Sequence, residues 1–416
     1  GETGLQTRIE AFMDTMADTQ FTEGDQNIPF RINIGKSGAP VVGVPSMGHL
    51  DGILRAILED CGVKTVKTPR LNRRAIEMGR DLAPEYICLP FAATLGQMVQ
   101  MLDAGASHIL MVGGKGRCRL GWYGQVQELL LKRTGRSFEM VVLDSPFPLS
   151  QNGLPFLRNI ARITGQARLD KVIRNLWFGY RKAIALDTVE KLCRDLRAWE
   201  RTRGTADQLL RRFASRIIDA AGYGSLDLIQ REFLECVRNT DLEDTGPLKV
   251  LIVGEIWVIL EPFINMEIER YLGSRDTPRV LVEKEMSISG WFEKNILHTA
   301  RMKREDDAIR AAAAPFLTEH VGGHGRESVG LSVMAAQNGL DGVVHLFPFT
   351  CMPEIVAQGV LIKVGETLNI PVISLIISEQ TGEAGLETRL EAFLDVLQER
   401  RPDRKEADYG AALYRH

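Results

Sequence analysis

The sequence predicts an α/β fold in which two parallel-sheet lobes flank a helical insert. From about residue 39, short β-branched runs alternate with amphipathic windows, as in sheets covered by helices on both faces. The alternation stops at about residue 149, in a stretch rich in Arg, Leu and Glu, and resumes after Thr245-Gly246-Pro247. These observations divide the chain into a first lobe (39–148), a helical insert (149–245) and a second lobe (246–400), followed by a polar tail (401–416).

The composition is that of a globular protein without an extended charged surface. Of the 416 residues, 44% are hydrophobic and 25% are charged, and a formal net charge of −3 does not suit a dedicated nucleic-acid binder. No apolar run reaches the roughly 18–20 residues of a membrane span, and no signal peptide opens the sequence. Six cysteines are too few for a disulfide scaffold in a chain of this length. We therefore expect a cytoplasmic protein without a nucleic-acid or membrane partner.

The first lobe contains four short apolar runs that we interpret as strands. They cover residues 40–44, 86–89, 108–112 and 140–143. Apolar residues at three- and four-residue spacing between them predict helices over residues 50–61, 95–102 and 123–132.

The second lobe repeats this alternation. We expect strands over residues 250–253, 280–282, 343–347 and 372–377, and helices over residues 262–272, 327–337, 353–368 and 387–400. The insert has amphipathic windows at residues 188–200 and 206–220, which predict helices that pack across both lobes.

The first residues of the chain repeat a segment near its end. Residues 1–14 match residues 382–395, with ten of the fourteen pairs identical. In the second copy, this segment follows an apolar strand and runs into the last helix. We therefore interpret residues 1–14 as the remnant of the last helix of a similar upstream module, and residues 15–38 as a linker. Chance similarity between two helix starts is the alternative.

Three cysteines fall where the predicted strands end. Cys88 closes the 86–89 strand, Cys118 lies in a glycine-rich loop after the 108–112 strand, and Cys351 follows the 343–347 strand. Ligands of open parallel sheets bind at the carboxyl ends of strands, so these thiols can meet between the lobes. Cys88 and Cys351 are each followed by an apolar residue and a proline, which indicates one loop design used twice. An iron–sulfur cluster, a zinc ion, and structural or redox thiols all remain consistent with this spacing, which has no CxxC pair.

The other cysteines, Cys61, Cys193 and Cys236, lie in helical windows and are expected to pack as small hydrophobic residues. The loop containing Gly322, Gly323 and Gly325 precedes a helix, so its amides can receive a phosphate or a cluster sulfide; a tight turn is the alternative.

At these residues the sequence resembles the 2-hydroxyacyl-CoA dehydratase family, the D-component-like module of 2-hydroxyglutaryl-CoA dehydratase. More closely, it resembles the module at the C-terminal end of large acyl-CoA dehydratase activase-related proteins. The resemblance extends over roughly residues 40–400, and the stretches that carry it are 88–91, 113–124, 253–256, 322–328, 348–354 and 379–385.

The resemblance implies two flavodoxin-like (Rossmann-like) lobes that hold a [4Fe-4S] cluster through Cys88, Cys118 and Cys351. One iron then has no cysteine ligand and is open to water, a side chain or substrate. Candidates for a nearby ligand or proton donor are Ser46, His49, His324 and Glu354. Ser46 and His49 also have a structural explanation, because they precede the helix that starts at Leu50.

In relatives that dehydrate, an ATP-driven activator supplies one low-potential electron. The sequence has no G-x-x-x-x-G-K-[ST] loop and no signature of an actin-like ATPase, so we expect that ATPase upstream in the same polypeptide or on a partner. The resemblance leaves room for an acyl-CoA substrate and for a homodimer. An electron-transfer or reductive dehydration role is therefore the leading hypothesis, and such a cluster is oxygen-sensitive and can be lost in air. A non-catalytic scaffold or docking module and a zinc–thiolate protein are the alternatives.

Overall fold

The computed structural model describes residues 39–113, 118–147, 149–164 and 168–401. The chain divides into two units, Gly1–Gly38 and Ala39–His416, and only the second contains described residues. The interpretations of residues 1–14, residues 15–38 and nearly all of the tail therefore lie outside the described part of the chain.

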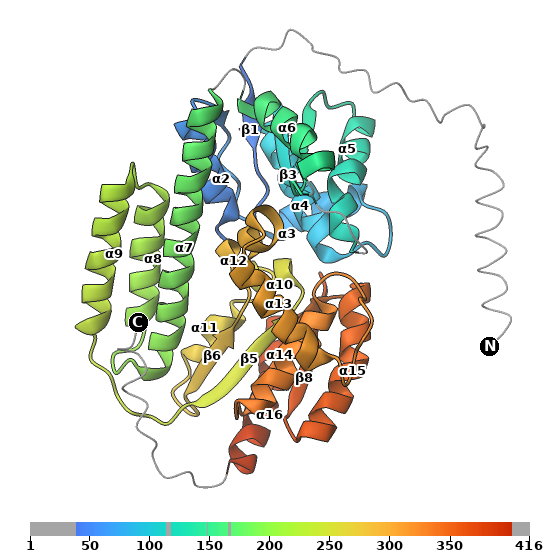
Figure 1. The fold of residues 1–416 in the computed structure, drawn as a ribbon. Helices are drawn as coiled ribbons and strands as arrows, with labels where there is room; N and C mark the ends of the chain where they lie inside the picture. Colours follow the sequence, from blue (N-terminus) through green and yellow to red (C-terminus); the bar gives the residue numbers. More distant parts are fainter. Residues whose placement is uncertain (1–38, 114–117, 148, 165–167, 402–416) are drawn as a thin grey trace, which may run out of the picture. The chain divides into compact units, whose positions relative to one another are not determined.

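The first lobe is built on a four-stranded parallel sheet. Its strands are β1 (Val41–Gly43), β2 (Lys64–Thr65), β3 (His108–Val112) and β4 (Glu139–Leu143), in the order β2-β1-β3-β4. The helices are α2 (Leu50–Asp60), α3 (Arg73–Leu82), α4 (Leu89–Asp103) and α5 (Tyr123–Arg133), and a 3₁₀ turn, η2 (Arg119–Trp122), leads into α5. Figure 1 shows this lobe around β1 and β3.

The second lobe repeats the same sheet topology. Strands β5 (Leu248–Gly254), β6 (Val280–Lys284), β7 (Gly342–Pro348) and β8 (Val372–Ile377) are parallel in the order β6-β5-β7-β8. Its helices are α10 (Ile256–Leu260), α11 (Ile268–Gly273), α12 (Ile288–Phe292), α13 (Ala300–Ala313), α14 (Gly325–Gln337), α15 (Met352–Leu368) and α16 (Glu383–Arg400), with a π-helical turn, η4 (Glu293–Leu297), after α12. The α/β fold with two parallel-sheet lobes is thus confirmed.

Between the sheets lies a helical segment of two parts. A π-helical turn, η3 (Leu149–Gly153), leads into α6 (Leu154–Thr164), which packs on β4 and belongs to the core of the first lobe. The long helix α7 (Leu169–Trp199), α8 (Thr205–Ile218) and α9 (Tyr223–Arg238) then lie side by side (Figure 1). α7 packs on α2 in the first lobe and on β6 in the second, so one hydrophobic core includes residues of both lobes and these helices.

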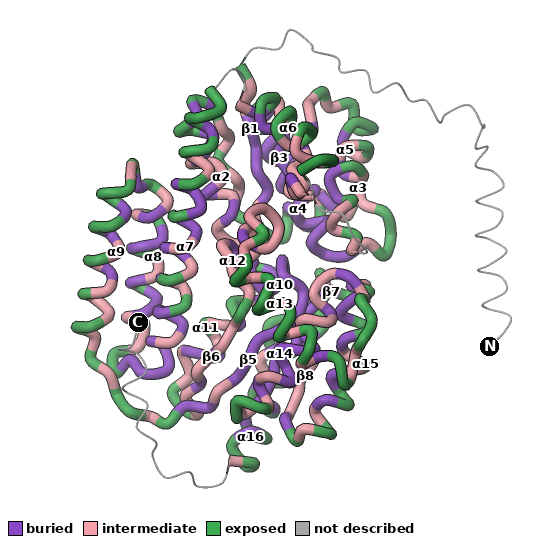
Figure 2. Tube along the Cα trace, viewed as in Figure 1, coloured by how far each residue is buried: buried purple, intermediate pink, exposed green. Residues whose placement is uncertain are grey.

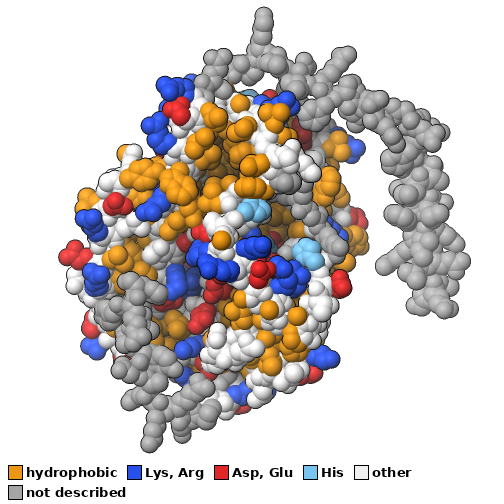
Figure 3. Space-filling model, in the orientation of Figure 1, with side chains coloured by type: hydrophobic (Ala, Val, Ile, Leu, Met, Phe, Trp, Pro, Cys, Tyr) orange, Lys and Arg blue, Asp and Glu red, His pale blue; other side chains and the backbone are white. Residues whose placement is uncertain are grey.

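The two central strands of the second lobe are deeply buried, and Figure 2 shows β5 and β7 buried along most of their length. Both are near-continuous apolar runs, as expected for strands that are covered on both faces. Figure 3 shows hydrophobic side chains gathered over α6 and the start of α7, where Leu154, Leu157, Leu169, Ile173 and Trp177 are exposed. No described helix combines the length and the apolar character needed to cross a bilayer.

Some predicted elements differ from the structure. The strand over residues 86–89 is wrong, because α4 begins at Leu89 and Cys88 is its N-cap. The apolar run favoured a strand, but Pro90 suits the first turn of a helix, where its missing N–H has no bonding partner to lose. The predicted helix over 262–272 is helical only from Ile268. The sequence did not predict ranges for β2, α3, α6, α9, α10, α12 and α13. β2 has two residues, α10 and α12 have five each, and α13 has only two apolar side chains larger than alanine, Met302 and Ile309.

Candidate functional site

The carboxyl edges of the two sheets face each other, and specific hydrogen bonds join them. The indole Nε1 of Trp257, just after β5, donates to the carbonyl of Ser46, after β1, at 2.9 Å. The amide of Gly48 donates to Oε2 of Glu261 at 3.3 Å. Both contacts link a loop of the first lobe to α10 or its C-terminal end. Since parallel sheets bind ligands at this edge, the facing loops form the candidate site.

Cys88 enters this region as the N-cap of α4. Its side chain is buried, and its thiol hydrogen-bonds the hydroxyl of Tyr123, the first residue of α5. Two glycines fix the position of α4 against α3, because Cβ atoms built on Gly79 and Gly96 would lie 1.8 Å and 1.7 Å from backbone oxygens of the facing helix. Only residues without a side chain allow this approach, so α4 presents Cys88 from a fixed position.

Cys351 repeats this arrangement in the second lobe. It is the buried N-cap of α15, with Pro353 in the first turn, just as Pro90 follows Cys88. The backbone before it turns sharply, because Thr350 has φ +74°. In both lobes a cysteine therefore lies at the N-terminus of a helix, where the backbone amides and the helix dipole stabilise negative charge.

Cys118 connects the two lobes. It is the N-cap of η2 and is half-buried. A Cβ built on Gly323 would lie 3.8 Å from its sulfur and 3.2 Å from Cβ of Pro353. The sulfur of a first-lobe loop therefore lies beside the loop before α14 and the start of α15. Residues 114–117, which precede Cys118, lie outside the described residues.

The three thiols share an electrostatic environment. Burial raises the pKa of Cys88 to about 11, and Tyr123, by hydrogen bonding, opposes that rise. Burial likewise raises the pKa of Cys118 and of Cys351. The carboxylate of Glu255 adds to the rise at all three cysteines, so one acidic group acts on each of these thiols. A positive centre among these sulfurs would reverse that effect and favour thiolates.

Glu255 itself is a buried N-cap. Its carboxylate accepts from the amides of Trp257 at 3.1 Å and Val258 at 2.9 Å, at the start of α10. Burial raises the pKa of Glu255 to about 7, although the two amides stabilise its charged form. It therefore fixes the loop after β5 and also carries a proton that leaves near neutral pH.

Glu354 belongs to a buried chain of hydrogen bonds below Cys351. Its Oε2 accepts from the hydroxyl of Ser328 at 2.9 Å and lies 2.9 Å from Nε2 of His345 in β7. Nδ1 of His345 lies 3.1 Å from the hydroxyl of Ser374 in β8. The other carboxylate oxygen, Oε1, is buried and has no hydrogen-bond partner among the described residues. A ligand that donates a hydrogen bond or carries positive charge would satisfy this oxygen.

His324 and its glycine neighbours lie between the thiols and a cavity of the second lobe. His324 is the N-cap of α14, and burial lowers the pKa of its imidazole while Glu327 opposes this shift. Gly322 and Gly323 have φ of +87° and +48°, so they form a turn that favours glycine. A Cβ on Gly325 would lie 2.4 Å from the carbonyl of Pro353. Gly323 and Gly325 therefore let α14 and α15 approach each other, with Pro353 filling the space beside them.

Ser46 and His49 have structural partners. The hydroxyl of Ser46 donates to Oε1 of Gln97 at 3.1 Å. Ser46 also borders a small cavity of about 20 Å³ with Trp257 and with Tyr123, the residue whose hydroxyl bonds Cys88. Nε2 of His49 lies 3.2 Å from Glu190 on α7, and His49 lines a different cavity of about 290 Å³. The structure therefore brings Ser46, His324 and Glu354 toward the cysteines and ties His49 to the helical insert.

The sequence is consistent with either a zinc ion or an iron–sulfur cluster at the three cysteines, and the structure allows the two to be compared. A single zinc ion needs its sulfur ligands at about 2.3 Å. In the described part of the chain, no three His, Cys, Asp or Glu side chains are placed to hold one ion. In a four-iron cluster each cysteine sulfur bonds a different iron, so the thiolates lie further apart than around a single ion. Three free cysteines from two lobes, with an unsatisfied carboxylate oxygen nearby, fit such a larger group.

Tyr123 and His345 are the site residues that the sequence did not indicate. Tyr123 begins a helix that the sequence predicts, but nothing in the sequence indicates its contact with Cys88. His345 stands inside an otherwise apolar strand, and a buried polar residue at such a position is the signal that could have marked it. Searches against known proteins add no identification: no family model matches this sequence, and no curated protein matches it.

Proposed function

We propose that this protein is an iron–sulfur module of the 2-hydroxyacyl-CoA dehydratase and activase type. The observation that supports this most strongly is that the first-lobe thiol of Cys118 lies beside Gly323 and Pro353, next to the helix that Cys351 caps. The buried carboxylate of Glu255 also acts on Cys88, Cys118 and Cys351 alike. The repeated Cys-x-Pro start of α4 and α15 adds to this support.

The chain's own groups suit the binding of a charged metal centre. Cys88, Cys118 and Cys351 would hold a [4Fe-4S] cluster, which when bound supplies a one-electron carrier with one iron free of cysteine. Tyr123 would keep a hydrogen bond on the Cys88 sulfur, and such bonds tune the reduction potential of a cluster. Cys88 and Cys351 are buried and Cys118 is half-buried, so the site is largely shielded from water.

Two groups of this chain are suited to hold a proton near the site. Glu354 receives hydrogen bonds from Ser328 and faces His345, so a proton can be held at Oε2 or at Nε2 of the imidazole. Burial lowers the pKa of His324 and so favours its neutral imidazole, which can receive a proton. A hydroxyl leaving group in a reductive dehydration needs a proton donor, and the pair of Glu354 and His345 is the better candidate for that role.

A partner that delivers electrons would need access to this site. Exposed apolar side chains flank all three cysteines: Tyr86 precedes Cys88, Trp122 follows Cys118, and Phe349 and Met352 flank Cys351. Arg80 and Glu379 form an ion pair across the lobes in the same region, where Arg80 also bonds the carbonyl of Ile87. We propose this rim as the contact surface for an actin-like ATPase activator. An acyl-CoA substrate and a homodimer remain predictions of the family resemblance.

Anaerobic reconstitution with iron and sulfide tests the proposal. The expected result is a brown protein with visible charge-transfer absorption and about four iron and four sulfide per chain. Cys88→Ser, Cys118→Ser and Cys351→Ser should each lower the iron content, while Cys236→Ser, in α9, should leave it unchanged.

Other outcomes identify the alternatives. A colourless protein that binds no metal would favour a scaffold or docking module. Stoichiometric zinc that is lost in the same three variants would favour a zinc–thiolate protein. Equal iron content in all four serine variants would remove these cysteines from the ligand set.

A further inference from the structure

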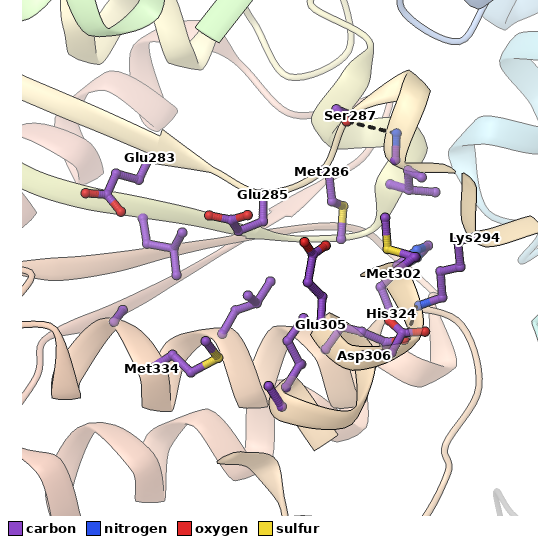
Figure 4. A pocket seen from close by; sticks show the side chains of 18 of the residues that line it. Glu283, Glu285, Met286, Ser287, Lys294, Met302, Glu305, Asp306, His324 and Met334 are labelled. Carbon is purple, nitrogen blue, oxygen red and sulfur yellow. Dashed lines mark hydrogen bonds and ion pairs between the residues drawn. The ribbon is translucent and has the colours of Figure 1, made fainter. Parts of the chain in front are cut away.

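A cavity of about 380 Å³ lies on one face of the second-lobe sheet. Its floor is formed by Leu251 of β5 and Glu283 of β6, which are register partners. Helices α13 and α14 form its walls, and α12 with η4 closes the side at the carboxyl end of β6 (Figure 4). The volume lies within the roughly 300–1,000 Å³ typical of small-molecule sites.

Most of the lining is apolar. Met286, Met302 and Met334 project from three different elements, and Ile309, Leu331 and Trp291 complete the surface. Methionine side chains adapt to ligands of varied shape, and an indole ring attracts organic cations. The cavity is therefore suited to a compact apolar body.

The charges on the lining are mostly negative. Glu305 points from α13 toward Glu285 and Met286 across the middle of the cavity, and Glu283 lies at one end (Figure 4). Outside the lining, Lys249 and Lys191 partly compensate Glu283, and Arg301 lies 3.8 Å from Glu305. The lining itself nevertheless carries five carboxylates (Glu283, Glu285, Glu305, Asp306 and Glu327) against one lysine, so its charge favours a cation over an anion.

At the opposite end, the one lysine of the lining is already neutralised. Nζ of Lys294 lies 3.0 Å from Asp306 and 2.9 Å from Glu327. The second oxygen of Glu327, Oε2, is buried without a hydrogen-bond partner among the described residues. A donor on a bound ligand would satisfy this oxygen, so the end of the cavity beside His324 also favours a hydrogen-bond donor over an acceptor.

We propose that this cavity binds a small organic cation, an amine with an aromatic or branched apolar body. The apolar walls would hold the body, and Glu283, Glu285 and Glu305 would hold the ammonium group. The proposal does not depend on a metal at the cysteines. It also implies that the phosphates of an acyl-CoA, being anionic, would have to bind elsewhere on the protein.

Calorimetric titration of the full chain, purified in air, tests the proposal with three probes of one shape. 2-Phenylethylammonium is the cation, 2-phenylethanol the neutral molecule and 3-phenylpropanoate the anion. We expect the cation to bind most tightly and the anion most weakly. Glu285→Gln and Glu305→Gln should each lower the affinity for the cation about threefold, because partly exposed ion pairs are individually weak. The double variant should lower this affinity about tenfold.

Two further variants separate this site from non-specific binding. Met334→Trp, which fills the cavity, should abolish binding of all three probes, with circular dichroism to verify that the variant is folded. Glu366→Gln, at an exposed position of α15 outside the cavity, should bind like the unchanged protein. Absence of binding by the cation, equal binding of anion and cation, or unchanged binding after Glu285→Gln and Glu305→Gln together would overturn the proposal.

Discussion

Nε2 of His345 lies 2.9 Å from Oε2 of Glu354, and both side chains are buried. Ser328 and Ser374 complete the hydrogen bonds at the two ends of this pair. Glu354 thus joins α14, α15 and two strands directly beneath the loop that carries Cys351. Removing it would leave a buried imidazole and a hydroxyl without their acceptor.

Glu354→Ala should therefore lower the free energy of unfolding by about 3 kcal/mol, because breaking a buried polar pair leaves its partners unsatisfied. Glu354→Gln keeps an acceptor oxygen, so its free energy of unfolding should fall by less. Urea unfolding measures this free energy for both variants. Glu366→Ala, on the exposed face of the same helix, should stay within about 0.5 kcal/mol of the unchanged protein. An equal effect of Glu354→Ala and Glu366→Ala would contradict the importance of the network.

The hydrogen bond between Tyr123 and Cys88 predicts the reactivity of the metal-free protein. Because burial raises the pKa of Cys88 to about 11, this thiol should be alkylated slowly at pH 8. Tyr123→Phe removes the hydrogen bond that lowers the pKa, so the thiolate fraction and the alkylation rate should fall further, by about three- to tenfold.

Mass spectrometry of iodoacetamide-treated protein measures this rate residue by residue. Cys236, on α9, provides the internal reference and should react at the same rate in both proteins. A faster reaction at Cys88 in the Phe variant would show that the phenol shields the sulfur and does not stabilise its thiolate.

The contact between α3 and α4 predicts a marked difference between two glycine substitutions. Gly96→Ala would place a methyl group 1.7 Å from the carbonyl oxygen of Ala75, so the helices must separate. We expect a loss of about 2–3 kcal/mol in the free energy of unfolding. Gly359→Ala, within α15, meets nothing within 4 Å and should stabilise the protein by about 0.5–1 kcal/mol. Two losses of similar size in thermal or urea unfolding would contradict the packing described for α4.

Glu261 predicts a pH dependence of stability. Burial raises the pKa of its carboxyl to about 7 from an ordinary value of 4.5. The folded protein therefore holds a proton that the unfolded chain releases, and this contribution is present below pH 4.5 and lost as the pH rises through 7. Between pH 4.5 and pH 8, the free energy of unfolding of the unchanged protein should fall by about 2–3 kcal/mol more than that of Glu261→Gln. Urea unfolding across this pH range measures both proteins. The same pH dependence of the free energy of unfolding in both would contradict a raised pKa at Glu261.

The sequence predicted the sheets well because their strands are short β-branched runs between polar loops. The strands from 108, 280, 343 and 372 lie where the pattern indicated them. The failure at residues 86–89 has a local cause: an apolar run of four residues does not distinguish a strand from the start of a buried helix. The proline at position 90 carried the information that decides between them.

The site was only partly predictable for a different reason. Cys88, Cys118 and Cys351 could be proposed from their positions after apolar runs. The contacts that define their surroundings, such as Tyr123 with Cys88 and His345 with Glu354, join residues on different elements. His49 illustrates the converse, because its contact with Glu190 depends on where the long insert helix packs.

The 31 residues of α7 form one continuous helix that contacts α2 of the first lobe and β6 of the second. Swinging the lobes apart would require this helix to bend or to leave one of its buried contacts. Access of iron or of a reductant to the interior would therefore depend on displacing surface loops, and hydrogen exchange should find those loops opening far more readily than the α7 backbone.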